Sequence, residues 1–111
     1  MAFFTIHPAP GLSRAERRRV SRHGPPAVAT PRSHRELLER AGFTDVTETD
    51  YSADFAAVAQ AWIDQWDLHR TEMEAMWGAA HVEDRQRGRR AYLRNVEAGI
   101  MRRSLFTARR P

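Results

Sequence analysis

The alternation of apolar and polar positions is clearest in residues 33–51 (SHRELLERAGFTDVTETDY), where it predicts a short helix followed by a strand. Ser33 and Glu36 have the spacing of a capping box, which begins a helix by satisfying its first backbone N–H groups. Gly42 stands where the left-handed residue that ends such a helix is expected. The β-branched residues of Val46–Tyr51 alternate in character and predict a strand. This segment is therefore half of an α/β unit.

Two further strands and three further helices are predicted outside this segment. Residues 2–6 (AFFTI) are apolar on both faces, which is typical of a buried strand in a parallel sheet. Residues 100–108 (IMRRSLFTA) have the composition of a strand at the end of the chain. A second capping box predicts a short basic helix over 13–22, and the proline-rich residues 24–31 predict a linker on the surface.

Between the second and third strands, apolar residues recur every three or four positions, which predicts two helices. We expect the first to begin after Ser52 and to end at Gly78. Its predicted apolar face consists of Phe55, Ala59, Trp62, Trp66, His69, Met73 and Met76. Its predicted polar face consists of Asp64, Asp67 and Glu74. The second helix is predicted from about His81 to Ala98, with Gly99 as its stop. Its predicted apolar face consists of Val82, Tyr92, Leu93 and Val96.

The predicted order is strand, helix, helix, strand, helix, helix, strand, which indicates an α/β fold. Its length of 111 residues fits a single domain covering 1–111. A helical crossover joins the first two strands, so we expect them to run in the same direction. The direction of the last strand does not follow from the pattern.

Composition excludes several classes of function. The chain has no cysteine, which excludes disulfides, thiolate metal sites and a cysteine nucleophile. It also lacks the G-x-S-x-G motif of serine hydrolases and the P-loop that binds nucleotide phosphates. No H-x-x-x-H motif is present, so we expect no metal site. No apolar run is long enough to cross a bilayer, and residues 1–8 do not have the features of a secretory signal, so we expect a cytoplasmic protein without a membrane partner.

The net charge is +4 and the pI is about 10.9, but all 18 basic residues are arginine and they are scattered in short runs. The absence of lysine favours a genomic composition bias over a selected polyanion site, so we do not expect nucleic acid as the partner. Two alternatives stay open: a small arginine-rich module that binds RNA or another polyanion, and a helical module that binds another protein through its 54–98 helices.

Three segments together carry a family resemblance. AFFTI near the start resembles the fifth strand of class I S-adenosylmethionine-dependent methyltransferases. LLERAGF at 37–43 resembles the end of the helix that leads into their sixth strand, and RRSLFTARRP at the end resembles their seventh strand. The resemblance covers essentially the whole chain and implies that it corresponds to the C-terminal half of such a methyltransferase. It implies a partial Rossmann-like sheet of three strands in the order first, third, second, with the last strand antiparallel. About four helices are expected, and residues 53–99 would form a helical insertion.

The cofactor site of this family lies in its first half, which supplies a glycine-rich turn and an acidic residue for the ribose. This chain contains no G-x-G in any register. We therefore expect a truncated enzyme, a split-gene product or a misassigned start, inactive alone and unable to bind S-adenosylmethionine without the full-length context.

The resemblance also suggests which residues face a substrate. Ligands of doubly wound sheets lie beyond the carboxyl ends of the strands, where His7 and Tyr51 stand. The helical insertion resembles the family's variable substrate cover, so Trp62 and Trp66 are candidates for lining an apolar pocket. Each of the four has a purely structural alternative, in a loop or in the core, and no catalytic residue is assigned. We expect a small-molecule methyl acceptor as the partner of the full-length protein, and self-association through the exposed edge of the first strand.

Overall fold

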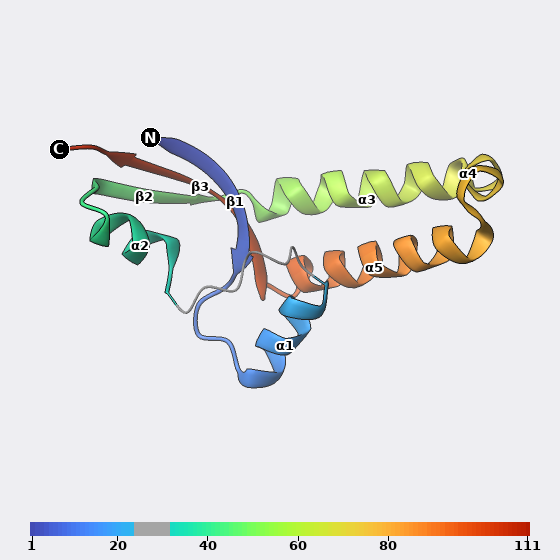
Figure 1. Ribbon diagram of the computed structural model, residues 1–111, viewed down its shortest axis with the longest axis horizontal. Coiled ribbons are helices and arrows are strands. Elements are labelled where there is room, and N and C mark those ends of the chain that lie inside the picture. The colour runs from blue at the N-terminus through green and yellow to red at the C-terminus, as the bar shows by residue number, and fades with distance from the viewer. Residues whose placement is uncertain (24–31) are drawn as a thin grey trace.

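The computed structural model describes residues 1–23 and 32–111. The elements, in chain order, are β1 (Ala2–Pro8), α1 (Arg14–His23), α2 (His34–Arg40), β2 (Thr44–Asp50), α3 (Ser52–Leu68), α4 (Arg70–Trp77), α5 (Ala79–Glu97) and β3 (Met101–Arg109). The predicted linker at 24–31 lies outside the described residues. Figure 1 shows the sheet at one end of the molecule and a long hairpin of α3 and α5, with α4 at its tip, extending from it.

The sheet has the strand order β1-β3-β2, and β3 is antiparallel to both neighbours. β1 and β2 therefore run in the same direction, as the helical connection between them predicts. The fold class expected from the family resemblance is confirmed, although the described residues form five helices where about four are expected. β1 differs from the expected buried, parallel-type strand, because it pairs antiparallel with β3 and its only buried residue is His7.

The helix before β2 ends as its sequence predicts. The Ser33 hydroxyl accepts a hydrogen bond from the N–H of Glu36 at 3.2 Å. Gly42 has a φ of 91°, and the N–H of Phe43 donates to the Leu38 carbonyl at 3.1 Å, which is the Schellman pattern. α2 then packs on one face of the sheet, where the cluster of buried apolar residues is Leu38, Val46, Phe106 and Ala108.

A second core lies on the opposite face, because successive strand residues point to opposite sides of a sheet. It joins Val20 of α1, Val96 of α5 and Met101 of β3 with Ile100. Helices α1 and α5 therefore pack against the face opposite α2. The second core fixes the base of the hairpin on the sheet, while the first holds α2 beside the end of β1.

The first long helix differs from its prediction in three ways. It is broken at His69, whose φ of −101° and ψ of 22° separate α3 from α4, although Gly78 ends the segment as expected. Ser52 is the first helical residue and not the N-cap, which is Tyr51. The Ser52 hydroxyl accepts instead from the N–H of Arg103 at 3.1 Å, so this serine joins the helix to β3.

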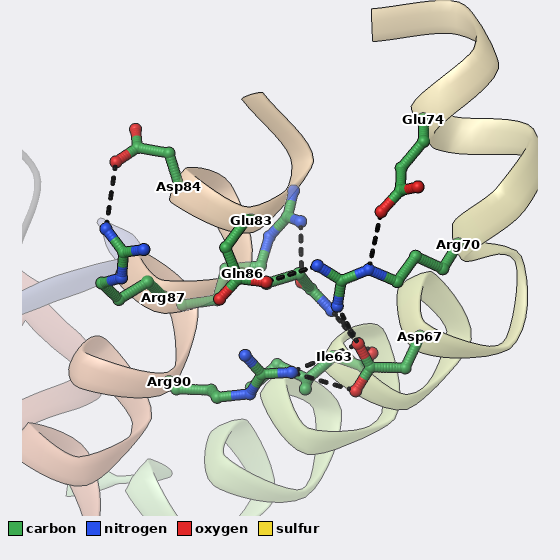
Figure 2. A network of polar contacts seen from close by, with 10 residues as sticks. Ile63, Asp67, Arg70, Glu74, Glu83, Asp84, Gln86, Arg87 and Arg90 are labelled. Atoms are coloured by element: carbon green, nitrogen blue, oxygen red, sulfur yellow. Dashed lines mark hydrogen bonds and ion pairs between the residues drawn. The ribbon is translucent and has the colours of Figure 1, made fainter. Parts of the chain in front are cut away.

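The predicted apolar face of this segment is only partly correct. Ile63 is the buried residue of α3, and Trp62 is 59% exposed. Met76 and His69 are exposed as well. The predicted polar face is wrong for Asp67, which points toward α5, because α5 carries the polar residues that this carboxylate binds (Figure 2).

Gln86 of α5 lies at the centre of the hairpin and is fully buried. Its amide donates to the Ile63 carbonyl and to Asp67 Oδ1, both at 3.0 Å. Arg90 donates to the same carboxylate at 3.1 Å, and Arg70 pairs with Glu83 and Glu74 (Figure 2). The hairpin is therefore held by a polar network as well as by apolar contacts, which hydrophobic periodicity does not reveal.

Candidate functional site

His7 connects all three strands at the carboxyl end of β1. Its Nε2 lies 3.0 Å from the hydroxyl of Ser104 in β3, and that hydroxyl lies 2.8 Å from Oε1 of Glu48 in β2. The same Nε2 is 3.4 Å from Glu48 Oε1. On the other side of the ring, Nδ1 lies 3.0 Å from the Pro8 carbonyl oxygen. His7 is 8% exposed and Ser104 is fully buried, so these contacts replace water.

The hydrogen-bond partners of His7 and Ser104 indicate which of their atoms donate. The Pro8 carbonyl is an acceptor, so Nδ1 must carry a hydrogen. Ser104 has one hydroxyl proton and donates it to the Glu48 carboxylate. Its oxygen also lies 3.0 Å from Nε2, so the Ser104 hydroxyl bridges the His7 ring and the Glu48 carboxylate.

A second histidine lies against the first. The ring centroid of His34, the first residue of α2, is 5.3 Å from that of His7 and 5.3 Å from that of Phe106. Burial lowers the pKa of His34, and the charge of His7 lowers it further, while Glu48 acts in the opposite direction. Its ring makes no hydrogen bond to any other side chain or backbone group in the described part of the chain. His34 is therefore a neutral imidazole with a nitrogen lone pair free to accept.

Both histidines line a cavity of about 380 Å³ between the end of β1 and the start of α2. The loop 8–12 forms one wall, and Glu48 and Phe106 contribute from the sheet. Four arginines complete the lining: Arg17, Arg32, Arg35 and Arg102. A cavity of this size fits a small molecule, and its position beyond a strand's carboxyl end is where α/β sheets bind ligands.

Of the four residues predicted to face a substrate, His7 alone lines this cavity. Tyr51 is the N-cap of α3 and places its ring edge-on against Phe4, with centroids 5.5 Å apart. Trp62 and Trp66 lie on α3 in the hairpin and do not line the cavity. Their role as a substrate cover stays a prediction.

Trp66 has its own packing partners in the hairpin. Its ring stacks on that of Trp77, with centroids 5.4 Å apart, and the Arg89 guanidinium lies 3.8 Å from its ring centroid. Burial lowers the pKa of Arg89. The exposed ring of Trp62, by contrast, is compatible with the helical interaction module left open by the sequence.

Three residues of the site are not found by sequence reasoning: His34, Glu48 and Ser104. They lie in the helix before β2, in β2 and in β3, and no spacing pattern links them to His7. They come together because β3 pairs with both outer strands. The sequence contains one weak indication of the site: His34 directly follows the helix cap Ser33, in the predicted connection between the first two strands.

Two kinds of feature are absent from residues 1–23 and 32–111. No three histidine or acidic side chains there are grouped so that they could hold a metal ion. Over the same residues, no helix is both long and apolar enough to cross a membrane. The sequence also contains no G-x-G, the glycine-rich turn through which doubly wound folds approach a nucleotide cofactor.

Comparison with known proteins shows the fold. No protein-family model and no curated protein matches the chain. Among solved structures, it is similar to phosphoethanolamine N-methyltransferase 2 of Haemonchus contortus, in complex with phosphomonomethylethanolamine and S-adenosylhomocysteine. The TM-score is 0.77 at 14% identity, and the match covers 99% of this chain but 26% of that one. The chain therefore has the fold of part of a methyltransferase and spans about a quarter of that enzyme's length.

Proposed function

We propose that this chain supplies the methyl-acceptor side of an S-adenosylmethionine-dependent methyltransferase. The observation that carries the proposal is the sheet, in which β3 lies antiparallel between two strands of common direction and matches a methyltransferase over 99% of the chain. The acceptor would be a small molecule, since the cavity beside His7 has a volume of about 380 Å³. The solved neighbour also binds a small methyl acceptor and S-adenosylhomocysteine.

The cavity's two histidines have different roles in this proposal. His7 is held by Ser104 and Glu48 and forms the rigid floor. His34 is neutral and can accept a hydrogen bond from an amine or hydroxyl group of the acceptor. By accepting this hydrogen bond, His34 would orient the nucleophile of the methyl acceptor, and such orientation is a large part of what enzymes contribute to transfer reactions.

The methyl donor's site would come from other strand–helix units, in the same polypeptide or in a partner chain. The proposal is supported by the absence of a G-x-G turn from the sequence and by the resemblance of its segments to the end of the methyltransferase sheet. The 111-residue chain alone would therefore be inactive.

The nucleotide sequence upstream of the Met1 codon tests this proposal, read in the same frame. Four further strand–helix units of about 30 residues correspond to roughly 120 codons. We expect an open frame, or an adjacent gene, that encodes a strand, a glycine-rich turn and a helix. A stop codon and ribosome-binding site directly upstream, with no such unit nearby, would contradict the proposal and favour the binding-module alternatives.

A further inference from the structure

The cavity beside His34 carries an unusual balance of charge. Its lining includes four arginines, contributed by α1, by both sides of the α2 N-terminus and by β3, and one carboxylate, Glu48. Like charges gathered around one small volume repel one another, and the repulsion is larger near protein than in bulk water. An anion in the cavity would relieve it.

Glu48 does not neutralise these arginines. Its carboxylate oxygen accepts from the Ser104 hydroxyl at 2.8 Å and lies 3.4 Å from Nε2 of His7. The acidic side chain among the described lining residues is therefore already engaged by Ser104 and His7, on its own face of the sheet.

Two of the four arginines already have acidic partners outside the cavity lining: Arg32 pairs with Glu36 at 3.4 Å, and Arg35 lies 3.9 Å from Glu39 and donates to the Val46 carbonyl. Arg17 and Arg102 keep donors available. Arg102 has one acidic neighbour, with its Nε 3.8 Å from Asp50 Oδ2, which is outside hydrogen-bond distance. Arg17 is exposed and forms no ion pair with any residue that the structure describes. Since each guanidinium has five N–H donors, Arg17 and Arg102 retain the paired geometry that binds an oxyanion through two parallel hydrogen bonds.

From these observations we infer that the cavity binds a small molecule through an oxyanion group, a phosphate or a carboxylate, held mainly by Arg17 and Arg102. Arginine suits this task because its planar, always charged group matches both anions. The volume of about 380 Å³ admits a small molecule and favours it over a nucleic-acid strand, which needs an open groove.

The inference deepens the proposed function and rests on it for one point, that the anion belongs to the methyl acceptor. The acceptor would then carry an oxyanion bound by the arginines and an amine or hydroxyl group that donates to His34. Binding of the anion itself requires no methyl donor, so the two claims can be tested separately.

Isothermal titration calorimetry with inorganic phosphate tests the inference on the 111-residue chain, at constant ionic strength maintained with chloride. We expect saturable one-site binding, weakened about tenfold or more by Arg17→Gln and by Arg102→Gln, because each substitution removes a charge-assisted pair of hydrogen bonds. Arg109→Gln is the matched control, since Arg109 is exposed and outside the cavity lining, and phosphate affinity should not change. Acetate in place of phosphate distinguishes the two kinds of oxyanion.

Circular dichroism of each variant shows whether the fold is kept, and the ¹H–¹⁵N shifts of Ala9, Gly11 and Leu12 report phosphate binding independently of heat. Absence of saturable binding in the folded wild-type chain, or equal weakening by Arg109→Gln, would overturn the inference. So would tight binding of a single-stranded RNA that both cavity substitutions leave unchanged. If phosphate binds but S-adenosylmethionine never does, even beside the upstream units, the anion site stands and the proposed function fails.

Discussion

The Nε2 atom of His7 and the hydroxyl oxygen of Ser104 are 3.0 Å apart, although 97 positions separate them in the sequence. This contact joins the start of the chain to its end through the middle strand of the sheet. The Glu48 carboxylate completes the group from the third strand. One buried serine of the middle strand thus connects side chains of both outer strands.

We expect Ser104→Ala to lower the free energy of unfolding by about 1–3 kcal/mol, because it removes the fully buried hydroxyl that bridges Nε2 of His7 and the Glu48 carboxylate. Urea denaturation measures the change. Ser21→Ala is the control, since Ser21 also borders the cavity but is exposed on α1, and its effect should stay within about 0.5 kcal/mol. Equal destabilisation by both substitutions would show that the Ser104 hydroxyl contributes nothing specific.

The titration of His34 should make the protein less stable in mild acid. Burial and the charge of His7 lower the pKa of this histidine in the folded state below its ordinary value of 6.5. Its contribution to stability is therefore fully present above pH 6.5, and is lost as the pH falls through the lower folded-state pKa, because the unfolded chain binds the proton first. We expect His34→Gln to flatten the fall in unfolding free energy between pH 7 and pH 5.

An NMR titration of the His34 ring protons checks the same point directly. The midpoint should lie below 6.5 in the wild-type chain and should rise in His7→Gln, which removes the neighbouring charge. A wild-type midpoint at or above 6.5 would contradict the neutral state on which the role of His34 depends.

Gln86→Ala should destabilise the hairpin by about 1–3 kcal/mol, since it removes a fully buried amide and its two hydrogen bonds from α5 to α3. The Gln86 hydrogen bond is also the main reason that the pKa of Asp67 lies below its ordinary value of 3.8, so that pKa should rise in the variant. Gln65→Ala, at an exposed position of α3, is the matched control for urea denaturation. Similar losses in both variants would show that the buried amide is not what holds α3 against α5.

The outer edge of β1 should promote self-association. The backbone N–H and C=O groups of odd-numbered residues in β1 point toward β3, as the two hydrogen bonds between Met1 and Ala108 show. Those of Phe4 therefore point to the open edge of the sheet. Phe4 is also 50% exposed. We expect Phe4→Lys to reduce the concentration-dependent light scattering of the chain, because a charge on an edge strand opposes pairing.

Leu37→Lys gives the control for this edge. It removes a similarly exposed apolar side chain and adds the same charge, but lies on α2. A wild-type chain that stays monomeric at all concentrations, or an equal reduction by Leu37→Lys, would contradict pairing through β1.

The parts of the fold that depend on neighbouring residues were predictable. Ser33 and Gly42 mark the ends of α2 because capping and left-handed turns are local chemistry. The central place of β3 followed only from the family resemblance, since pairing between distant strands leaves no periodic signal in one sequence. The break at His69 was not predicted, because the apolar repeat continues through it. The exposure of Trp62 was not predicted either, because the buried polar residue Gln86 binds a different face of α3 to α5.

The site was predictable only at His7. Its position at the end of an apolar strand placed it near a ligand, whereas Tyr51 is turned onto the other face of the sheet by the start of α3. Strand register brings Ser104 and Glu48 to His7, and the packing of α2 brings His34. These are long-range contacts, which composition and spacing do not specify.

The most direct test of the central claim is a calorimetric titration of S-adenosylmethionine into the purified 111-residue chain. The three strands and the cavity beside His34 are proposed to form the acceptor side of a methyltransferase whose donor site lies elsewhere. We predict no saturable binding to the chain alone, and binding with the ordinary stoichiometry of one when the upstream strand–helix units are included. Stoichiometric binding by the isolated chain would contradict the claim, because the donor site would then be built from residues already present.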